Sequence, residues 1–215
     1  MKSKSQKSAL IWGGFIVFII LLIWTLVRLG GGASTKLVSN ISEQDQIKGN
    51  PEASLQIVEY SDFQCPACKS YYPIIKQIAN TYGEDVAVVY RHFPLEQIHP
   101  AAMDAALAAE AAGKQGRFWD MHDILFNTQE VWSQDEDPKA KILQYAESLR
   151  LDMDRFRSDM ESSEVKKKVQ DDMLSGEKSG VNSTPTFFFN NVKKSFPPNY
   201  ETFKEAVEQA LQGNA

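Results

Sequence analysis

The chain contains two cysteines, Cys65 and Cys68, separated only by Pro66 and Ala67. Such a pair is a redox dithiol, a structural disulfide or half of a metal site. At the first turn of a helix this spacing brings both sulfurs within bonding range, and proline suits the first helical position. Free N–H groups and the helix dipole there lower the pKa of the first thiol from about 8.5 to roughly 3.5–7.5. Cys65 is therefore the candidate nucleophile, and Cys68 is the candidate resolving thiol.

The two other interpretations of the cysteine pair fit this sequence less well. A structural disulfide stabilises mainly by closing a long loop, and a ring of four residues restricts the unfolded chain very little. Zinc requires four ligands, and the three histidines, His92, His99 and His122, include no pair spaced by four residues. His122 itself lies at helical spacing from Phe118, which favours a packed or surface histidine over a catalytic base.

A strand, a helix and a second strand are predicted around the dithiol. Residues 55–60 are rich in β-branched and aromatic residues, which is typical of a strand. The helix that begins at Pro66 carries apolar residues on one face and ends near Gly83. Residues 86–90 are almost entirely apolar, as buried parallel strands are. The three elements together predict a βαβ unit of an α/β fold.

A helical insertion, a hairpin and a closing helix are predicted for the remainder. Residues 98–175 contain several helical segments, and the alanine-rich start of this region is typical of closely packed helices. Residues 186–190 and 192–196 form a predicted hairpin across an Asn-Asn turn, and residues 200–211 form an amphipathic helix. The predicted order is β-α-β, helical insertion, β-β-α, within one domain over residues 51–215.

The N-terminal residues predict a membrane anchor. Three lysines within residues 1–8 precede an apolar run in residues 9–29, which matches the roughly 20 residues that cross a bilayer. This run exceeds the apolar core of about 7–15 residues in a cleaved signal peptide, although cleavage after Ala33 is an alternative. The lysines place residues 1–8 in the cytoplasm, and the domain outside it, where disulfides persist. Residues 30–50 are polar and are interpreted as a linker.

Charge and length exclude some classes of protein. Four of the 23 basic residues and none of the 28 acidic ones precede Ser34, so the rest of the chain has a net charge of −9. Such a balance offers no basic patch for nucleic acid. The exported part is long enough for one domain with a full hydrophobic core and too short for two comfortable ones.

Several local motifs make the sequence resemble a known family. The order of elements, with a dithiol at the first helix and a Thr-Pro pair before the third strand, resembles a thioredoxin fold. The motifs are similar to those of the DsbA family of exported thiol-disulfide oxidoreductases. They are VEYSDFQCPAC (58–68), YRHFPL (90–95), GRFWDMH (116–122) and TPTF (184–187). They span most of the chain from Leu55 onward.

The resemblance implies roles for particular residues. It implies that Cys65 and Cys68 are the redox pair and that Pro185 is a cis-proline facing them. Thr184, before that proline, is expected to offer backbone groups to an extended substrate in the manner of strand addition, and Pro66 and Ala67 are expected at the same substrate surface. Glu59, six residues before Cys65, corresponds to a buried acid below Cys68 that can relay a proton. The alternative for Glu59 is a solvated glutamate at the end of a strand.

One position departs from the family pattern. The type member has histidine immediately before its second cysteine, where this chain has Ala67. Ala67 adds no positive charge near a Cys65 thiolate, and Asp62 nearby has the wrong sign. Less stabilisation of the thiolate predicts a milder oxidant, so the direction of electron flow stays open.

The resemblance implies an oxidase that introduces disulfides into exported proteins through Cys65 and Cys68, and the apolar run predicts that it is anchored in the membrane. Its re-oxidation is expected to require a quinone-linked membrane oxidase of the DsbB or VKOR type, with no metal or organic cofactor. One alternative is a reductase that keeps exported thiols reduced, for instance before haem attachment. Another is a redox sensor or peptide-binding module without turnover. The absence of an evident dimerisation segment favours a monomer.

Overall fold

The computed structural model describes residues 19, 21 and 36–213 of the chain. The predicted cytoplasmic segment 1–8, nearly all of the predicted anchor 9–29 and the first part of the predicted linker 30–50 lie outside these residues. Within the described part, no helix is both long enough and apolar enough to cross a membrane.

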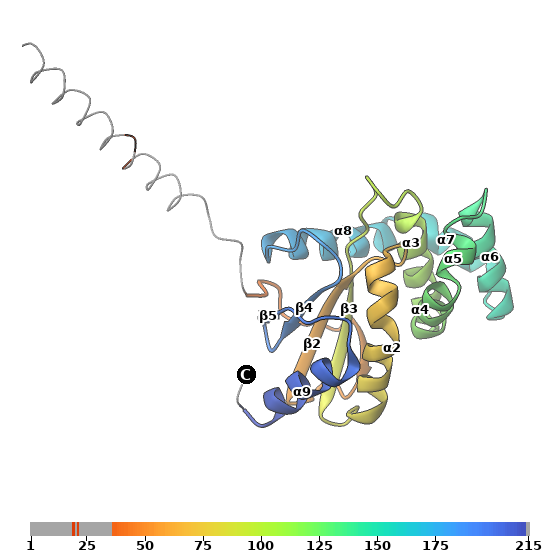
Figure 1. The fold of residues 1–215 in the computed structure, drawn as a ribbon. Coiled ribbons are helices and arrows are strands. Elements are labelled where there is room, and N and C mark those ends of the chain that lie inside the picture. Colours follow the sequence, from red (N-terminus) through yellow and green to blue (C-terminus); the bar gives the residue numbers. More distant parts are fainter. Residues whose placement is uncertain (1–18, 20, 22–35, 214–215) are drawn as a thin grey trace, which may run out of the picture. The chain divides into compact units, whose positions relative to one another are not determined.

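A five-stranded sheet forms the centre of the domain (Figure 1). Its strands are β1 Gln46–Gly49, β2 Leu55–Ser61, β3 Val86–His92, β4 Thr186–Phe189 and β5 Val192–Lys194. The strand order is β1-β3-β2-β4-β5, with β2 and β3 parallel and the other pairs antiparallel. Every residue of β3 is buried, as the apolar sequence predicted for a central parallel strand.

The helices follow the predicted order. They are α2 Pro66–Thr81, α3 Ala102–Gly113, α4 Phe118–Asn127, α5 Gln129–Trp132, α6 Pro138–Ser148, α7 Met153–Glu161, α8 Ser163–Lys178 and α9 Tyr200–Leu211. Helix α2 joins the parallel strands β2 and β3, which confirms the predicted βαβ unit. Helices α3 to α8 form the insertion between β3 and β4 that the sequence placed at about residues 98–175.

Helices cover both faces of the sheet (Figure 1). Alternate side chains of a strand point to opposite faces, and those of Ile57 and Phe187 pack in one core with residues of α2 and α9. On the other face, Tyr60 lies against α8, where its hydroxyl is 2.7 Å from Ser175 Oγ. A Cβ atom at Gly176 would lie 2.8 Å from the Phe93 ring, so a glycine is required for this close approach of α8.

The alanine-rich helix α3 lies at the centre of the insertion. Nine of its twelve residues are buried, and α4, α6, α7 and α8 all contact it. Small side chains allow helices to approach closely on several sides, since little volume separates the backbones. The prediction that the alanine run serves helix packing is confirmed.

The interpretation of residues 30–50 as a linker is wrong for the part that the structure describes. Residues 46–49 form the edge strand β1, antiparallel to β3. Farther upstream, Lys36 forms a bridge with Val192 at the opposite edge of the sheet. Between them, Asp45 forms a buried ion pair with Arg91, Nε to Oδ1 2.8 Å. Besides backbone hydrogen bonds and this ion pair, the apolar side chains of Leu37, Ile41 and Ile47 pack against the core. They are too few and too irregularly spaced to give the periodic pattern that marks a packed element.

Candidate active site

The two cysteines occupy the start of α2 with unequal exposure. Cys65 is the N-cap residue, and Pro66 begins the helix, as predicted. Cys68 lies one turn further on, with a side chain that is 0% exposed, against 7% for Cys65. Both are free thiols in this structure. The sulfur of Cys65 is therefore the one that an incoming reactant reaches first.

The loop between β2 and α2 is fixed by a buried carboxylate. Asp62 Oδ1 accepts from the Gln64 N–H at 2.7 Å, and Oδ2 accepts from the Leu95 N–H at 2.9 Å and pairs with His99 Nδ1 at 2.7 Å. The Asp62 N–H in turn lies 3.5 Å from the Cys68 sulfur. The sequence had indicated only a nearby negative charge, whereas the Asp62 side chain links this loop to the segment that follows β3.

A side chain from the helical insertion holds the same loop from another direction. Gln129 of α5 is buried, and its Nε2 donates to the carbonyl oxygens of Phe63 at 2.7 Å and of Cys65 at 3.0 Å. Sequence analysis did not single out Gln129, because 64 residues separate it from Cys65.

The Thr184–Pro185 peptide bond is cis and adjoins the dithiol, as predicted. The Cys65 thiol donates to the Thr184 carbonyl oxygen at 3.5 Å. The Thr184 hydroxyl is buried and has no hydrogen-bond partner among the described residues. Thr184 therefore presents two polar groups beside the Cys65 sulfur.

The surroundings drive the two thiol pKa values apart. The hydrogen bond from Cys68 is the largest cause that lowers the pKa of Cys65 to about 5, against the effect of burial, and Thr184 and the Ala67 N–H add to it. Burial raises the pKa of Cys68 well above its usual value, and the adjacent Cys65 and the charge of Glu59 raise it further. At neutral pH the arrangement holds a thiolate on Cys65 and a thiol on Cys68.

Glu59 is buried, which excludes the solvated alternative. Its side chain belongs to the central strand β2, where the residue is 4% exposed. Burial raises the pKa of Glu59 to about 7. A carboxyl group with such a pKa exchanges protons near neutral pH, and its charge acts on Cys68.

His122 lies in the packed interior of the domain. His122 packs among aromatic rings, including Phe63 and Phe126 at centroid distances of 5.7 and 5.0 Å. Burial lowers the pKa of His122, while Asp123, which pairs with Nδ1 at 3.0 Å, opposes this effect. His122 is thus a packed histidine, one of the two options that the sequence favoured.

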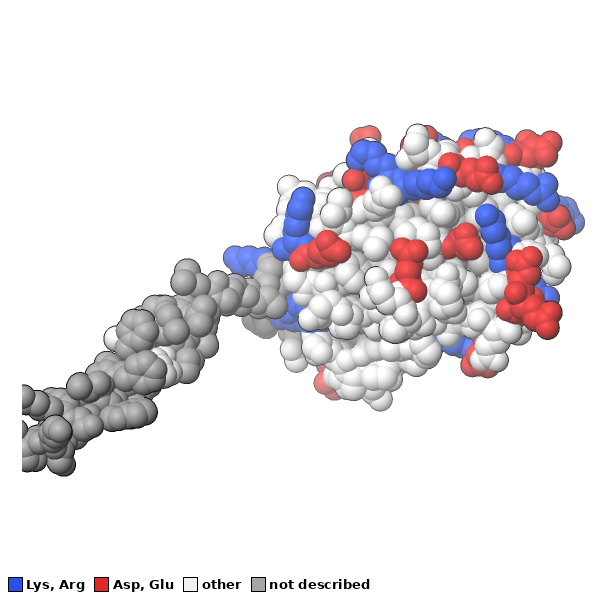
Figure 2. Space-filling model, turned by 90° about the horizontal axis from the view of Figure 1, so that it is seen from above, with Lys and Arg blue, Asp and Glu red and all other residues white. Residues whose placement is uncertain are grey.

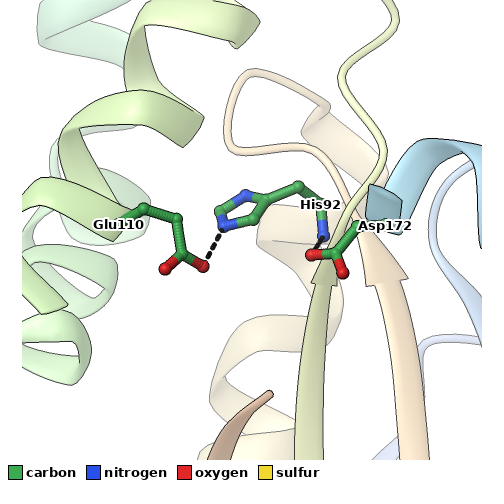
Figure 3. A group of neighbouring side chains, drawn as sticks. All are labelled: His92, Glu110 and Asp172. Carbon is green, nitrogen blue, oxygen red and sulfur yellow. Dashed lines mark hydrogen bonds and ion pairs between the residues drawn. The ribbon is translucent and has the colours of Figure 1, made fainter. Parts of the chain in front are cut away.

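His92 belongs to a second cluster of titratable groups, with Glu110 and Asp172 (Figure 3). His92 Nε2 lies 2.9 Å from Glu110 Oε1, and the other Glu110 oxygen accepts from Gln46 at 2.8 Å. Asp172 accepts from the His92 N–H at 3.0 Å and from the Lys168 ammonium at 2.7 Å. These carboxylate oxygens already have donors, and one donor is a cation. The cluster is therefore a hydrogen-bonded network that joins β3, α3 and α8.

Charged side chains of both signs are interspersed on the face of the domain shown in Figure 2. This face presents no broad basic field of the kind that binds nucleic acid.

Comparison with known proteins identifies the family. A model of the family described as Thioredoxin matches residues 42–209. An Na(+)/H(+) antiporter NhaA 3 of Salinispora tropica is 40% identical over 169 residues, covering 79% of this chain and 25% of that protein. An Na(+)/H(+) antiporter NhaA 1 of Salinispora arenicola is 39% identical over 188 residues, covering 87% and 28%. The chain spans about a quarter of the length of these curated relatives.

Solved structures show the same fold. A thioredoxin-like oxidoreductase from Silicibacter pomeroyi has a TM-score of 0.68 and 26% identity, covering 80% of this chain and 94% of that one. Oxidised BdbD from Bacillus subtilis has a TM-score of 0.73 and 23% identity, covering 85% and 100%. Wolbachia pipientis alpha-DsbA1 has a TM-score of 0.72 and 21% identity, covering 83% and 96%. With the family match over most of its length, the dithiol at the start of α2 and the cis-proline beside it, this chain belongs to the thioredoxin family.

Proposed function

We propose that this chain is a thiol-disulfide oxidoreductase that oxidises thiols of exported proteins. The observation that carries the proposal is the difference between the two cysteines: Cys65 is the more exposed, at 7% against 0%, and has a lowered pKa, whereas Cys68 has a raised pKa. Similarity to a thioredoxin-like oxidoreductase of known structure supports the same activity.

The reaction begins with the disulfide form. A substrate thiolate attacks the Cys65 sulfur, the bond between Cys65 and Cys68 breaks, and Cys68 leaves with the electron pair and takes up a proton. A second substrate thiolate then attacks the substrate sulfur of the mixed disulfide and expels Cys65 as a thiolate. The substrate loses two electrons, and the cysteine pair gains them. A thiol of low pKa leaves faster, so the surroundings of Cys65 favour this second step.

The direction of electron flow follows from the stability of the reduced form. Groups that stabilise the Cys65 thiolate stabilise the dithiol relative to the disulfide, which makes the pair more oxidising. We therefore favour the oxidase over the reductase. The reduction potential of the purified chain, measured by equilibration with glutathione, is expected at or above about −180 mV, the value of protein disulfide isomerase. A value near that of thioredoxin, about −270 mV, would make the chain a reductase.

Trapping tests the assignment of the two sulfurs, and oxidation of a reduced protein substrate tests turnover. Cys68→Ser keeps the attacking sulfur and removes the resolving one, so it should accumulate mixed disulfides with exported proteins, while Cys65→Ser should not. Equal trapping by both variants would contradict the assignment of the two sulfurs. If the wild-type chain does not oxidise a reduced protein substrate, it is a redox sensor or a binding module and not an enzyme.

The proposed location is outside the cytoplasm, with residues 9–29 as a single-pass anchor and residues 1–8 inside. This arrangement rests on the lysines before the apolar run. It also allows re-oxidation by a quinone-linked membrane oxidase. A protease added to cells without their outer layers should remove the Cys65 domain. Protection of the domain would refute the topology, and recovery of a mature chain beginning at Ser34 would refute the anchor.

A further inference from the structure

Unpaired hydroxyl groups gather at the dithiol. In the part of the chain that the structure describes, the buried side-chain oxygens without a hydrogen-bond partner include the hydroxyls of Ser61, Tyr90 and Thr184. Buried polar groups are nearly always paired, so an unpaired one requires a reason. The Thr184 hydroxyl adjoins Cys65, whereas the Ser61 hydroxyl lowers the pKa of Cys68 and of Glu59.

The strand β2 places Ser61 beside both the buried acid and the buried thiol. Ser61 is two residues beyond Glu59 in this strand, so the two side chains lie on the same face. Burial raises the pKa of Glu59 and of Cys68, and the Ser61 hydroxyl lowers both pKa values. The hydroxyl must therefore lie next to the Glu59 carboxyl group and next to the Cys68 sulfur. It completes a hydrogen bond to neither one, so its proton can turn toward either.

The other titratable groups around Glu59 come from four elements, β1, α2, β3 and α4. Tyr90 of β3 is paired with Glu59 in the sheet, and burial and the charges of Glu59 and Cys68 raise the pKa of its phenol well above the usual value. Tyr90 therefore stays neutral and can only donate or accept a hydrogen bond. A cavity of about 10 Å³, enough for about one water, also adjoins Glu59. Its other charged or titratable lining groups are Lys48, Tyr72, Lys76, His122 and Asp123.

Resolution of a mixed disulfide, on the function proposed above, requires the Cys68 thiol to lose its proton, although this side chain is 0% exposed. We propose that the Ser61 hydroxyl is a catalytic residue that carries this proton from the Cys68 sulfur to the Glu59 carboxylate. Ser61 Oγ accepts the proton of Cys68 while its own proton passes to Glu59. The step begins with a thiol and a carboxylate and ends with a thiolate and a carboxylic acid, and the hydroxyl is regenerated.

The Cys68 thiolate then attacks the Cys65 sulfur and expels the thiolate that was bound there. In the opposite direction, Cys68 leaves the disulfide and recovers its proton from Glu59 through the same hydroxyl. A hydroxyl suits this position because it donates and accepts at once.

The test separates the reactions of the two sulfurs. The reduced full-length chain is mixed with excess oxidised glutathione, samples are quenched with acid, and mass spectrometry counts the glutathione adduct and the internal disulfide. Formation of the adduct reports Cys65, and its conversion to the internal disulfide, which releases reduced glutathione, reports Cys68. Both rates are measured from pH 5 to pH 9 in the wild type, Ser61→Ala and Ser61→Thr.

Ser61→Ala should form the adduct at the wild-type rate and convert it roughly 10²-fold more slowly at pH 7.5, the loss expected for a missing proton carrier. Ser61→Thr keeps a hydroxyl and should restore the conversion. Stability should not fall in Ser61→Ala, because the lost hydroxyl has no partner. The matched control is Ser158→Ala, which changes an exposed serine of α7, and both of its rates should equal those of the wild type.

Two results would overturn the relay: an unchanged conversion rate in Ser61→Ala, or equal slowing of both steps, which would indicate a structural role. Failure of the wild-type chain to form any glutathione adduct would overturn the proposed function itself. The two failures are therefore distinguishable in one experiment.

Discussion

Several neighbours stabilise the thiolate of Cys65, and the side chain of Ala67 is not one of them. The Cys68 thiol contributes most, and Thr184 and two backbone N–H groups contribute as well. The family comparison drew attention to Ala67, whose side chain adds no charge. The structure shows that the backbone N–H of Ala67 takes part instead. That the chain is a milder oxidant than the type member stays a prediction.

Thr184→Val tests the contribution of the unpaired hydroxyl beside Cys65. The variant keeps the shape of the side chain and removes a donor to the thiolate, so the pKa of Cys65 should rise by roughly one unit, since one hydrogen bond to a charged group is worth about 1.5–3 kcal/mol before exposure weakens it. Ultraviolet absorbance of the thiolate, followed against pH, measures the change. Thr184→Ser should titrate like the wild type, and an unshifted valine variant would show that the hydroxyl points elsewhere.

Glu59→Gln should change the pH dependence of stability. The usual pKa of this carboxyl group is 4.5, and its pKa in the folded chain is about 7. Between pH 4.5 and pH 7 the carboxyl group is ionised in the unfolded chain and protonated in the folded one, so the wild type loses stability as pH rises. This loss amounts to about 3 kcal/mol. Reduced wild type and Glu59→Gln should unfold alike at pH 4, and the variant should be more stable at pH 8. Parallel thermal unfolding profiles from pH 4 to pH 8 would contradict the raised pKa.

At the scale of elements, the short helix α5 positions the catalytic loop. It has four residues, too few to be stable alone. Trp132 fixes it from inside the insertion, donating to the Leu125 carbonyl at 2.8 Å. Its other end carries Gln129, which binds the loop before α2. The insertion is therefore coupled to the geometry at Cys65.

Gln129→Leu should destabilise the domain by about 1–3 kcal/mol, because the Phe63 carbonyl loses its buried donor. Amide hydrogen exchange should also accelerate in residues 62–65, which the glutamine no longer holds. Denaturant unfolding and exchange mass spectrometry measure the two effects. Gln134→Leu, at an exposed position, is the matched control. Wild-type exchange in the Gln129 variant would mean that other contacts fix the loop.

At the scale of the whole domain, residues 36–49 connect both edges of the sheet. Arg91 anchors this segment with donors to the carbonyl oxygens of Ser39 at 3.1 Å and Asn40 at 2.9 Å. It also pairs with both oxygens of Asp45. Burial acts to raise the pKa of Asp45, but the pairing with Arg91 outweighs it and holds that pKa below the usual value. The segment upstream of β2 is thus part of the folded domain.

Asp45→Ala should lower the free energy of unfolding by about 3–5 kcal/mol, because it leaves the buried Arg91 guanidinium without its carboxylate. The exposed neighbour Glu43 offers a control, since Glu43→Ala should change stability by less than about 0.5 kcal/mol. Denaturant unfolding at pH 7 compares the three proteins. Because the folded pKa of Asp45 is lowered, the difference between wild type and Asp45→Ala should shrink as pH falls below about 4. Equal stability of the two variants would mean that residues 36–45 contribute nothing to the folded domain and are a linker.

The sequence by itself determined the features that depend on neighbours along the chain. Cys65 and Cys68 at a helix start, the burial of β3 and the helical insertion all follow from spacing, composition and periodicity within short windows. The burial of Glu59 and the cis bond before Pro185 were also predicted, but only through the resemblance of local motifs to a family.

Tertiary structure alone decided which distant side chains meet at the dithiol. Gln129 reaches Cys65 across 64 residues, and Tyr90 stands opposite Glu59 only because of the register between β2 and β3. The strand β1 likewise exists because a neighbouring strand offers free backbone groups, which no side-chain pattern records. Pairing across a sheet and hydrogen bonds between distant elements form only once the chain has folded, so local sequence carries no periodic signal of them.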